Sequence, residues 1–349
     1  MTTDCDVCII GSGAGGAPVA YTLAKAGQSV VVLEKGPWLR DEHFYKDELA
    51  CCRRSVYTPE LRHEQHVIEE LDGEGGWTAT PTSESGWDFW NGSLVGGSSN
   101  LMSGFFPRLK PVDFRQLSEL GPIDGANRVD WPISYADLEP YYDRVERLIG
   151  VSGRITPRSG PHPAQEPRSR PDFPYPPTAE HPVSGWIDRA CESLGFHALA
   201  VPRAILSRAD LGRRACEYSG YCGSFGCASG AKGVARAALL EPALATGRCQ
   251  IRPRAKVHRL LSDRRGRVTA AEYVDADGRL QQVTAKRFVV ACQAVETSRL
   301  LLASRGPRFP DGLANNHGQV GRNLLFSAGG SGSGDLEYGS LTPEQAAQL

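Results

Sequence analysis

Two short apolar runs near the start of the chain, at residues 6–10 and 29–33, have the composition of strands buried in a parallel sheet. Between them, residues 14 to about 25 predict a helix, and Gly27 follows at the position of a helix C-terminal stop. The order of strand, helix and strand predicts a βαβ unit at the beginning of an α/β fold.

Helical spacing of apolar residues recurs further along the chain. The clearest case is 137–149, which Ser134 precedes as an N-terminal cap and Gly150 follows as a stop. Nine prolines between 155 and 182 instead predict an extended connection, because proline cannot continue a helix or a sheet ladder. Other helical patterns cover 59–71, 183–194 and 234–244.

The last third of the chain has strand patterns. A fully apolar run at 288–292 suits the centre of a parallel sheet. Residues 275–278, Asp-Ala-Asp-Gly, predict a turn. Short strands are predicted at 249–251, 256–261, 268–274 and 281–284.

A glycine-rich loop joins the first strand to the first helix. Gly11 permits a tight turn, Gly13 lets the backbone approach a pyrophosphate, and Gly16 lets the helix pack close to the sheet. The N-terminal end of the helix adds backbone N–H donors for phosphate oxygens. The loop therefore predicts a dinucleotide site.

Glu34 ends the second strand, 23 residues after Gly11. An acid near this distance accepts hydrogen bonds from a ribose 2′-hydroxyl and would repel the 2′-phosphate of NADP. FAD and NAD carry the same ADP moiety, so the loop and Glu34 leave both cofactors open.

Composition and charge narrow the class of protein. The chain has 349 residues, of which 40% are hydrophobic and 23% charged, as in soluble globular proteins. A net charge of −1 gives no reason to expect a nucleic acid partner. No apolar run approaches 18 residues and no signal-peptide pattern opens the chain. We therefore expect a cytoplasmic protein without a membrane span, unless it is exported on a partner's signal.

Three further motifs follow the nucleotide loop. The first is the small-residue loop from Gly92 to Ser99, which contains Gly96-Gly97-Ser98-Ser99. The second, from Asp130 to Tyr142, opens Asp-Trp-Pro-Ile-Ser-Tyr. The third, from Val289 to Ser304, is an apolar strand that turns into a helix, and 318–324 adds a related tail. In this order the motifs resemble those of the glucose–methanol–choline (GMC) oxidoreductases, in particular the bacterial FAD-dependent dehydrogenases.

The resemblance implies an α/β fold with a Rossmann-like FAD-binding domain and inserted cap or substrate segments. It also implies FAD as the cofactor and oxidation of a CH–OH group, with hydride transfer to flavin N5. Val257 would meet the adenine through its backbone. The expected cofactor contacts are Gly11, Ser12, Gly13, Ala14, Gly15, Gly16, Glu34, Lys35, Gly96, Gly97, Ser98, Ser99, Asn100, Val257 and Ala294.

The resemblance also divides the chain. The FAD-binding domain would comprise 1–40, 89–110 and 216–325, the inserted segments 41–88 and 111–215, and the start of a substrate domain or a tail 326–349. In the family the catalytic histidine comes from a C-terminal segment that nothing in this chain matches. We therefore assign no catalytic residue and expect that the C-terminal half of the family fold is missing from this chain.

The partners expected from the resemblance are a small-molecule alcohol, with a sugar, polyol or sterol-like alcohol as candidates, and an electron-acceptor subunit or the missing half. Two other functions stay open at this point. An NAD-dependent dehydrogenase would share the nucleotide loop but has no use for the later motifs. A non-catalytic FAD-binding remnant, or one part of a split enzyme, would share every motif and differ only in turnover.

Cys216, Cys222 and Cys227 lie in a glycine-rich stretch that ends at Lys232. Three thiolates in such a loop are candidate ligands of an iron–sulfur cluster or of zinc. The spacings lack the Cys-x-x-Cys pair usual for those ligands, which favours a structural thiol loop near the flavin. No metal ligand is therefore assigned.

Overall fold

The computed structural model describes residues 3–44, 67–71, 73–81, 84, 92–155, 166–326 and 332–349. The chain divides into two compact units. The first unit is Met1–Gly104 with Ala209–Arg322, and the second is Phe105–Arg208 with Asn323–Leu349.

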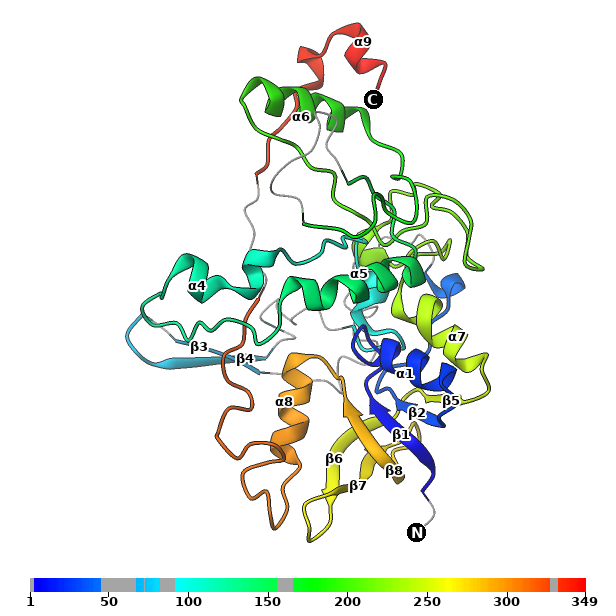
Figure 1. Cartoon of the computed structure of the whole chain (residues 1–349), viewed down its shortest axis with the longest axis vertical. Helices are drawn as coiled ribbons and strands as arrows, with labels where there is room; N and C mark the ends of the chain where they lie inside the picture. The colour runs from blue at the N-terminus through cyan, green and yellow to red at the C-terminus, as the bar shows by residue number, and fades with distance from the viewer. Residues whose placement is uncertain are drawn as a thin grey trace. The chain divides into compact units, whose positions relative to one another are not determined.

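A six-stranded sheet organises the first unit (Figure 1). Its strand order is β5-β2-β1-β8-β7-β6. The pairs β5–β2, β2–β1 and β1–β8 are parallel, whereas β8–β7 and β7–β6 are antiparallel. The strands are β1 (Cys5–Ile10), β2 (Val30–Leu33), β5 (Cys249–Arg252), β6 (Lys256–Ser262), β7 (Val268–Val274) and β8 (Leu280–Val290).

Strand β8 corrects one prediction. Residues 281–284 and 288–292 were expected as separate strands, but Leu280–Val290 is one continuous strand. Its first half pairs antiparallel with β7 and its second half pairs parallel with β1, so the strand changes partners without a break. The apolar second half lies at the centre of the sheet, as predicted, and ends at Val290.

Helix α1 (Gly16–Lys25) follows β1 and packs through small buried side chains, namely Ala17, Ala20 and Ala24. It starts two residues later than predicted and ends before Gly27, which has a φ of +83°. The predicted helix 234–244 forms a π-helical turn (Arg236–Leu240) continued by α7 (Glu241–Leu244). Both of these helical pieces contact α1.

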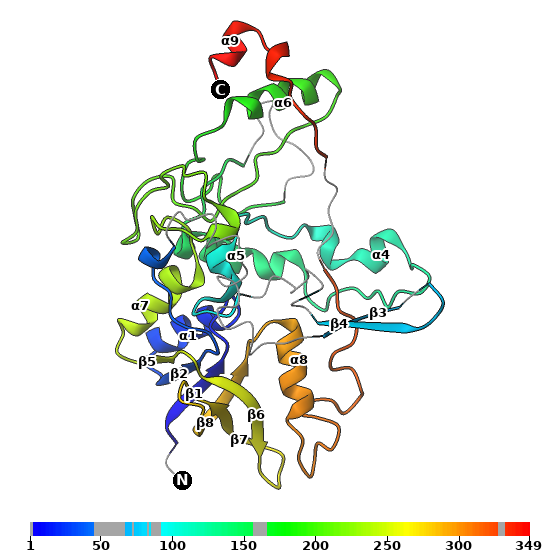
Figure 2. The same ribbon diagram turned by 180° about the vertical axis from the view of Figure 1, so that it is seen from behind.

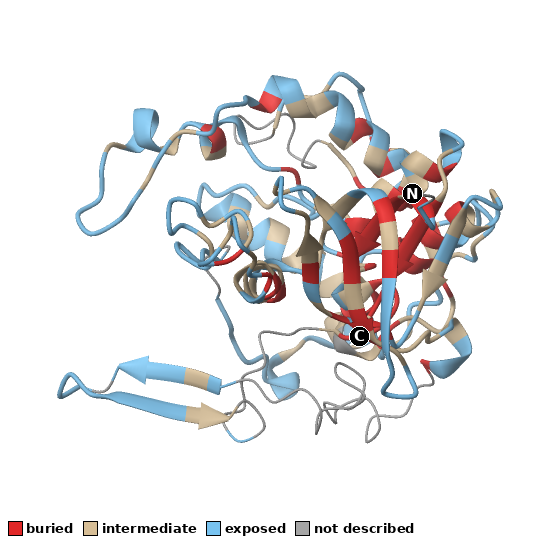
Figure 3. Cartoon of the chain, turned by 90° about the horizontal axis from the view of Figure 1, so that it is seen from below, coloured by how far each residue is buried: buried red, intermediate tan, exposed pale blue. Residues whose placement is uncertain are grey.

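Helix α8 (Ala294–Ala303) packs beside β6, as Figure 2 shows. It is fixed there by the Leu260 N–H, which donates to Ser304 Oγ at 2.9 Å. A cluster of buried apolar side chains fills the space between the sheet and this helix, and Figure 3 shows the concentration of buried residues in the strands. Leu300 of α8, Val257 of β6 and Ile10 of β1 belong to this cluster.

An antiparallel hairpin of β3 (Val67–Leu71) and β4 (Trp77–Pro81) corrects the helical pattern predicted over 59–71. Residues 59–66 lie outside the described residues. The pairing of Leu71 with Trp77 closes the hairpin around a glycine-containing turn. The hydrogen bonds between the two strands stabilise the hairpin, and helical periodicity within 59–71 does not reveal the partner strand on which they depend.

The second unit contains α4 (Gln116–Leu120), α5 (Tyr135–Ile149), α6 (Pro182–Ser193) and α9 (Pro343–Ala346). The prediction for α5 is confirmed: Ser134 forms a capping box with Asp137, and Gly150 closes the helix in a left-handed conformation. Short helical turns elsewhere are Asp41–His43, Gly97–Leu101, Pro111–Phe114, Gly223–Phe225 and Tyr338–Ser340.

A buried ion-pair network stabilises the second unit. Arg108 donates two parallel hydrogen bonds to Glu146, at 2.8 and 2.9 Å, and Arg168 donates to the same carboxylate. Arg108 also donates to Glu139 and to the hydroxyl of Tyr135. Shared charges and hydrogen bonds offset the cost of burying these groups. In the part of the chain that the structure describes, no helix is long and apolar enough to cross a membrane.

Candidate nucleotide-binding site

A cavity of about 710 Å³ opens in the first unit beyond the C-terminal ends of β1, β2 and β8. Ligands of open α/β sheets bind at this edge, outside the carboxyl ends of the strands. Most of the predicted cofactor contacts line the cavity: Gly11, Ser12, Gly13, Ala14, Gly15, Glu34, Lys35, Gly97, Ser98, Ser99, Val257 and Ala294.

Ser12 connects two of the predicted motifs. Its hydroxyl donates to Glu34 Oε2 at 2.6 Å and accepts the backbone N–H of Gly96 at 3.0 Å. The Ser12 N–H also donates to Glu34 Oε2, at 3.1 Å. Both side chains are buried. The loop after β1, the end of β2 and the Gly96–Ser99 loop are therefore joined by one set of hydrogen bonds.

Close backbone contacts explain several glycines of the site. A Cβ added at Gly97 would lie 3.0 Å from Gly13 Cα, and one added at Gly36 would lie 1.9 Å from the Ser93 carbonyl oxygen. A side chain at Gly97 would separate the small-residue loop from the nucleotide loop, and one at Gly36 would separate it from the segment after β2. The sequence analysis did not single out Gly36, although its place directly after Glu34 and Lys35 was available as a signal.

The turn between β8 and α8 contacts the same nucleotide loop. A Cβ at Gly11, whose φ is +94°, would lie 2.4 Å from the Ala291 carbonyl oxygen. A Cβ at Gly16 would lie 2.0 Å from the Gly11 carbonyl oxygen and 3.2 Å from Ile9 Cγ2. The role predicted for Gly16, close packing of helix on sheet, agrees with this geometry.

Gly16, Gly96 and Asn100 were predicted as direct cofactor contacts but do not line the cavity. Each supports a residue that does. Asn100 Nδ2 donates to the Val95 and Gly97 carbonyl oxygens. Spacing and resemblance indicate the segments in which these three residues lie, but not which side of the segment each one occupies.

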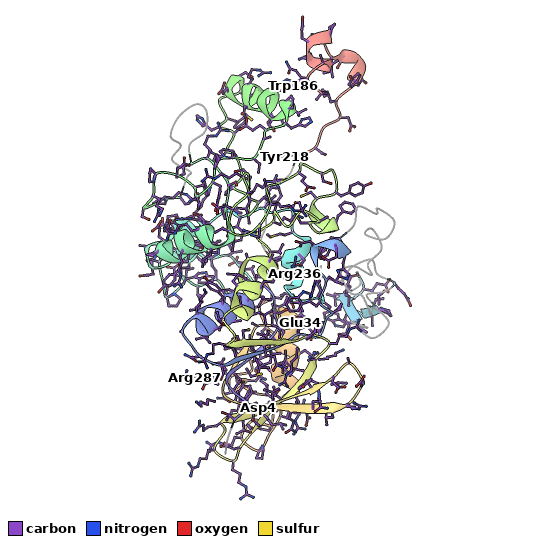
Figure 4. The ribbon with its side chains drawn as sticks, turned by 90° about the vertical axis from the view of Figure 1, so that its right-hand side faces the viewer. Asp4, Glu34, Trp186, Tyr218, Arg236 and Arg287 are labelled. Carbon is purple, nitrogen blue, oxygen red and sulfur yellow. The ribbon has the colours of Figure 1, made fainter. Side chains whose placement is uncertain are left out.

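Arg236 lies behind Gly96, where an added Cβ would come within 2.9 Å of Arg236 Cβ. The buried guanidinium forms ion pairs with Asp41 and with Glu241. Figure 4 labels Arg236 and Glu34, both in the first unit. A charged pair thus fixes the backbone that carries Gly96.

Glu34 retains capacity for one further hydrogen bond. Oε2 accepts two donors from Ser12, and Oε1 accepts the Gly36 N–H at 2.9 Å. Because a carboxylate has about four acceptor sites, one site on Oε1 can still receive a ribose hydroxyl. Burial raises the pKa of Glu34, against the opposing effect of these hydrogen bonds.

Charged residues that the sequence analysis did not assign line another part of the cavity. Glu296 on α8 pairs with Lys35 Nζ at 3.6 Å and with Arg299 Nε at 2.7 Å. Arg299 also donates to the Val257 carbonyl oxygen at 3.3 Å. These contacts join the end of β2, helix α8 and strand β6. Glu296 and Arg299 are three residues apart on one helix, but their contacts with Lys35 and Val257 join residues too far apart in sequence for spacing to have predicted them.

Cys292 lines the cavity and is partly buried. Burial raises the pKa of its thiol to about 11, so the side chain is neutral near pH 7. The thiol lies 3.5 Å from the Ile10 carbonyl oxygen. Cys292 therefore acts as a small apolar residue in the cavity.

The cysteine-rich loop is organised by a lysine. Lys232 is buried, and its ammonium donates to the Gly223 and Gly226 carbonyl oxygens, each at 3.3 Å. Cys216 Sγ accepts the Tyr218 N–H, and Cys227 Sγ lies 3.4 Å from Ser229 Oγ. Among the described residues, no three His, Cys, Asp or Glu side chains are grouped so that they could hold a metal ion.

The cavity fits a dinucleotide cofactor. Gly11, Gly13 and Gly97 line the cavity with backbone, and Glu34 keeps an acceptor for a ribose hydroxyl. Val257 and Ala255 supply an apolar surface for a base. Among the described residues that line the cavity, none is a histidine.

Comparisons with known proteins agree with this geometry. Paromamine 6′-oxidase of Streptomyces fradiae is 36% identical over 324 residues, which cover 92% of this chain and 53% of that protein. The 2-methyl-1,2-propanediol dehydrogenase of Mycolicibacterium austroafricanum is 34% identical over 333 residues, which cover 93% of this chain and 56% of that protein. The chain thus spans about half the length of these curated relatives.

A third relative is the fructose dehydrogenase large subunit of Gluconobacter japonicus, at 30% identity over 98% of this chain and 64% of that protein. Pyridoxine 4-oxidase from Mesorbium loti shares the fold, with a TM-score of 0.51 and 20% identity over 86% of this chain and 52% of that one. Residues 6–44 match an FAD binding domain and residues 173–327 match the GMC oxidoreductase family model. The chain thus contains a GMC oxidoreductase family domain together with an FAD binding domain.

Proposed function

We propose that this chain binds FAD in the cavity of the first unit and takes part in the oxidation of a CH–OH group of an alcohol or sugar. One observation carries the proposal. The loop from Gly11 to Gly16, or the strand end beside it, is in contact with three segments that are distant in sequence. These segments are Ser93–Gly97, Glu34–Gly36 and Ala291. Bound FAD would supply the two-electron acceptor for the hydride of the alcohol carbon.

The residues of the chain would bind and orient the cofactor. Gly13, Ala14 and Gly15 line the cavity just before the start of α1, where the N-terminal end of the helix favours phosphate oxygens. Glu34 would accept a ribose hydroxyl on its remaining acceptor site. Ser98 and Ser99 line the cavity from the small-residue loop and would lie against the flavin.

The substrate class is proposed from the relatives' names. The three relatives are named for an amino sugar, a diol and fructose, all of which carry CH–OH groups. We infer a hydroxyl group of a sugar, polyol or related alcohol as the substrate of the complete active site. The segments 41–88 and 111–215 are our proposal for the parts that shape the substrate side.

A partner is part of the proposal. One relative is named as a large subunit and another, from Pantoea cypripedii, as a gluconate 2-dehydrogenase flavoprotein. On the model of these names, we propose that the partner is an electron-acceptor subunit. The alternative partner is a further protein segment that completes the active site, since no described residue lining the cavity is a histidine that could act as the base.

Anaerobic reduction tests the function. The FAD-loaded chain is mixed with a panel of sugars, polyols and simple alcohols, and the flavin absorbance is followed with and without a co-expressed candidate partner. Substrate-dependent bleaching supports the oxidoreductase. Tight FAD binding with no bleaching under either condition would favour the alternative, a non-catalytic FAD-binding protein.

A further inference from the structure

Gln293, at the turn between β8 and α8, has an unusual backbone conformation. Its φ is +73° and its ψ is 166°, a region that is essentially restricted to glycine. Residues held in such a region cluster at ligand-binding and catalytic sites, where surrounding contacts offset the strain. Gln293 also lines the nucleotide cavity. The strain is therefore located at the site itself.

The side chain of Gln293 is oriented by helix α8. Its Oε1 accepts the N–H of Val295 at 2.8 Å and the N–H of Glu296 at 3.3 Å. Two donors on one side of the carboxamide require the oxygen there, so the amide assignment is fixed. Nε2 is then directed away from these helix amides, and among the described residues it donates to no protein acceptor.

Capping alone does not account for a glutamine at this position. Ser, Thr, Asp, Asn and Gly are the favoured N-cap residues, and Gly would also tolerate this backbone conformation. Glutamine has neither advantage. Its longer side chain instead carries an amide that caps the helix through its oxygen and still presents an N–H₂ group to the cavity.

The phosphate loop lies next to this turn. The Ala291 methyl group would be 3.5 Å from a Cβ added at Gly15, and Cys292 Cα would be 3.0 Å from one added at Gly11. We propose that Gln293 is a cofactor-binding residue whose Nε2 donates to an oxygen of the dinucleotide, on the pyrophosphate or the adjoining ribose. This inference rests on the proposed FAD site.

Two substitutions distinguish the effect of the Nε2 donor from the effects of the helix cap and of the backbone strain at Gln293. Gln293→Glu keeps the length and the acceptor oxygen for Val295 and Glu296 but cannot donate, so we expect an increase of about tenfold in the FAD dissociation constant. Gln293→Gly removes the donor and relieves the backbone, so we expect FAD affinity to fall about fivefold while the apoprotein melts at an equal or higher temperature. Gln319→Glu, an exposed change outside the cavity, is the matched charge control.

Calorimetric titrations of the full chain with FAD, ADP and adenosine identify the acceptor. If the acceptor is a phosphate oxygen, both Gln293 variants lose affinity for FAD and ADP but not for adenosine. If it is a ribose hydroxyl, the loss extends to adenosine. Either result supports the assignment, provided that Gln319→Glu binds as the wild type does.

Two outcomes would overturn it, and they are distinguishable. Wild-type binding of FAD and ADP with unchanged constants in both Gln293 variants would reject the role of Gln293 and leave the FAD site intact. Failure of the folded wild-type chain to bind either ligand would reject the FAD site and the assignment together.

Discussion

The hydroxyl of Ser12 donates a 2.6 Å hydrogen bond to Glu34 Oε2, and both side chains are buried. The same hydroxyl accepts the N–H of Gly96, so one oxygen joins the loop after β1, the end of β2 and the small-residue loop. This relationship makes the position of the small-residue loop depend on the nucleotide loop. Changes at Ser12 should therefore affect folding and cofactor binding together.

Ser12→Ala is expected to destabilise the chain by about 1–3 kcal/mol, because it leaves the buried Gly96 N–H without its acceptor. FAD affinity should fall in the same variant, since the two loops are no longer held together. Denaturant unfolding and an FAD titration measure the two effects. Ser193→Ala, at an exposed helix end, is the control and should change neither. A Ser12→Ala protein as stable as Ser193→Ala would contradict the role of this hydrogen bond.

Glu34 should make stability depend on pH. Burial raises its pKa above the ordinary value of 4.5, so the folded state binds this proton more tightly than the unfolded chain does. The contribution of Glu34 to the unfolding free energy is therefore largest below pH 4.5 and decreases as pH rises through the raised pKa. Glu34→Gln removes this titration. The difference in unfolding free energy between the wild type and Glu34→Gln should therefore favour the wild type more at acidic pH than at neutral pH. A difference that favours the wild type more as the pH rises would contradict this prediction.

Substitution of Gly97 tests the close contact between the small-residue loop and the nucleotide loop. Its φ is +58°, and a Cβ there would lie 3.0 Å from Gly13 Cα. Gly247 has a similar φ of +68° but no atom near an added Cβ. Both Ala substitutions therefore carry a left-handed backbone cost of about 1 kcal/mol, but only Gly97→Ala also separates the loops. FAD affinity should fall at least about tenfold in Gly97→Ala alone. Equal affinities in the two variants would exclude a role for the Gly13–Gly97 contact.

The thiols should differ in reactivity. Burial raises the pKa of Cys292 to about 11 and that of Cys8 to about 12, whereas Cys222 is exposed. Because the thiolate is the reactive form, Cys222 should be alkylated before Cys8 and Cys292 at mildly alkaline pH, and Cys292 only as the pH approaches 11. Time-resolved labelling with peptide mapping gives the order. Early labelling of Cys292 would show that its environment is more open than described.

Much of the fold could be predicted because its signals are local. The strands β1 and β2, the helix between them and the capped helix α5 follow from short apolar runs and from cap residues such as Ser134 and Gly150. The errors occurred where pairing partners decide the structure. Residues 67–71 form a strand because Trp77–Pro81 pairs with them, and β8 is one strand because β7 and β1 succeed each other as its neighbours.

The candidate site could also be predicted only in part. Spacing and resemblance selected most of the residues that line the cavity, but they could not separate lining residues from supporting ones such as Asn100. The Lys35–Glu296 ion pair and the backbone of Gln293 were missed, since a long-range ion pair and a positive φ at a glutamine have no signal in a single sequence.

The most direct test of the account is the absorption spectrum of the purified, folded chain, followed by parallel titrations with FAD and NAD⁺. The account predicts flavin bands in the protein as isolated, or saturable one-to-one binding of added FAD, and no comparable binding of NAD⁺. A folded chain, verified by circular dichroism, that binds NAD⁺ in preference to FAD, or binds neither, would contradict it.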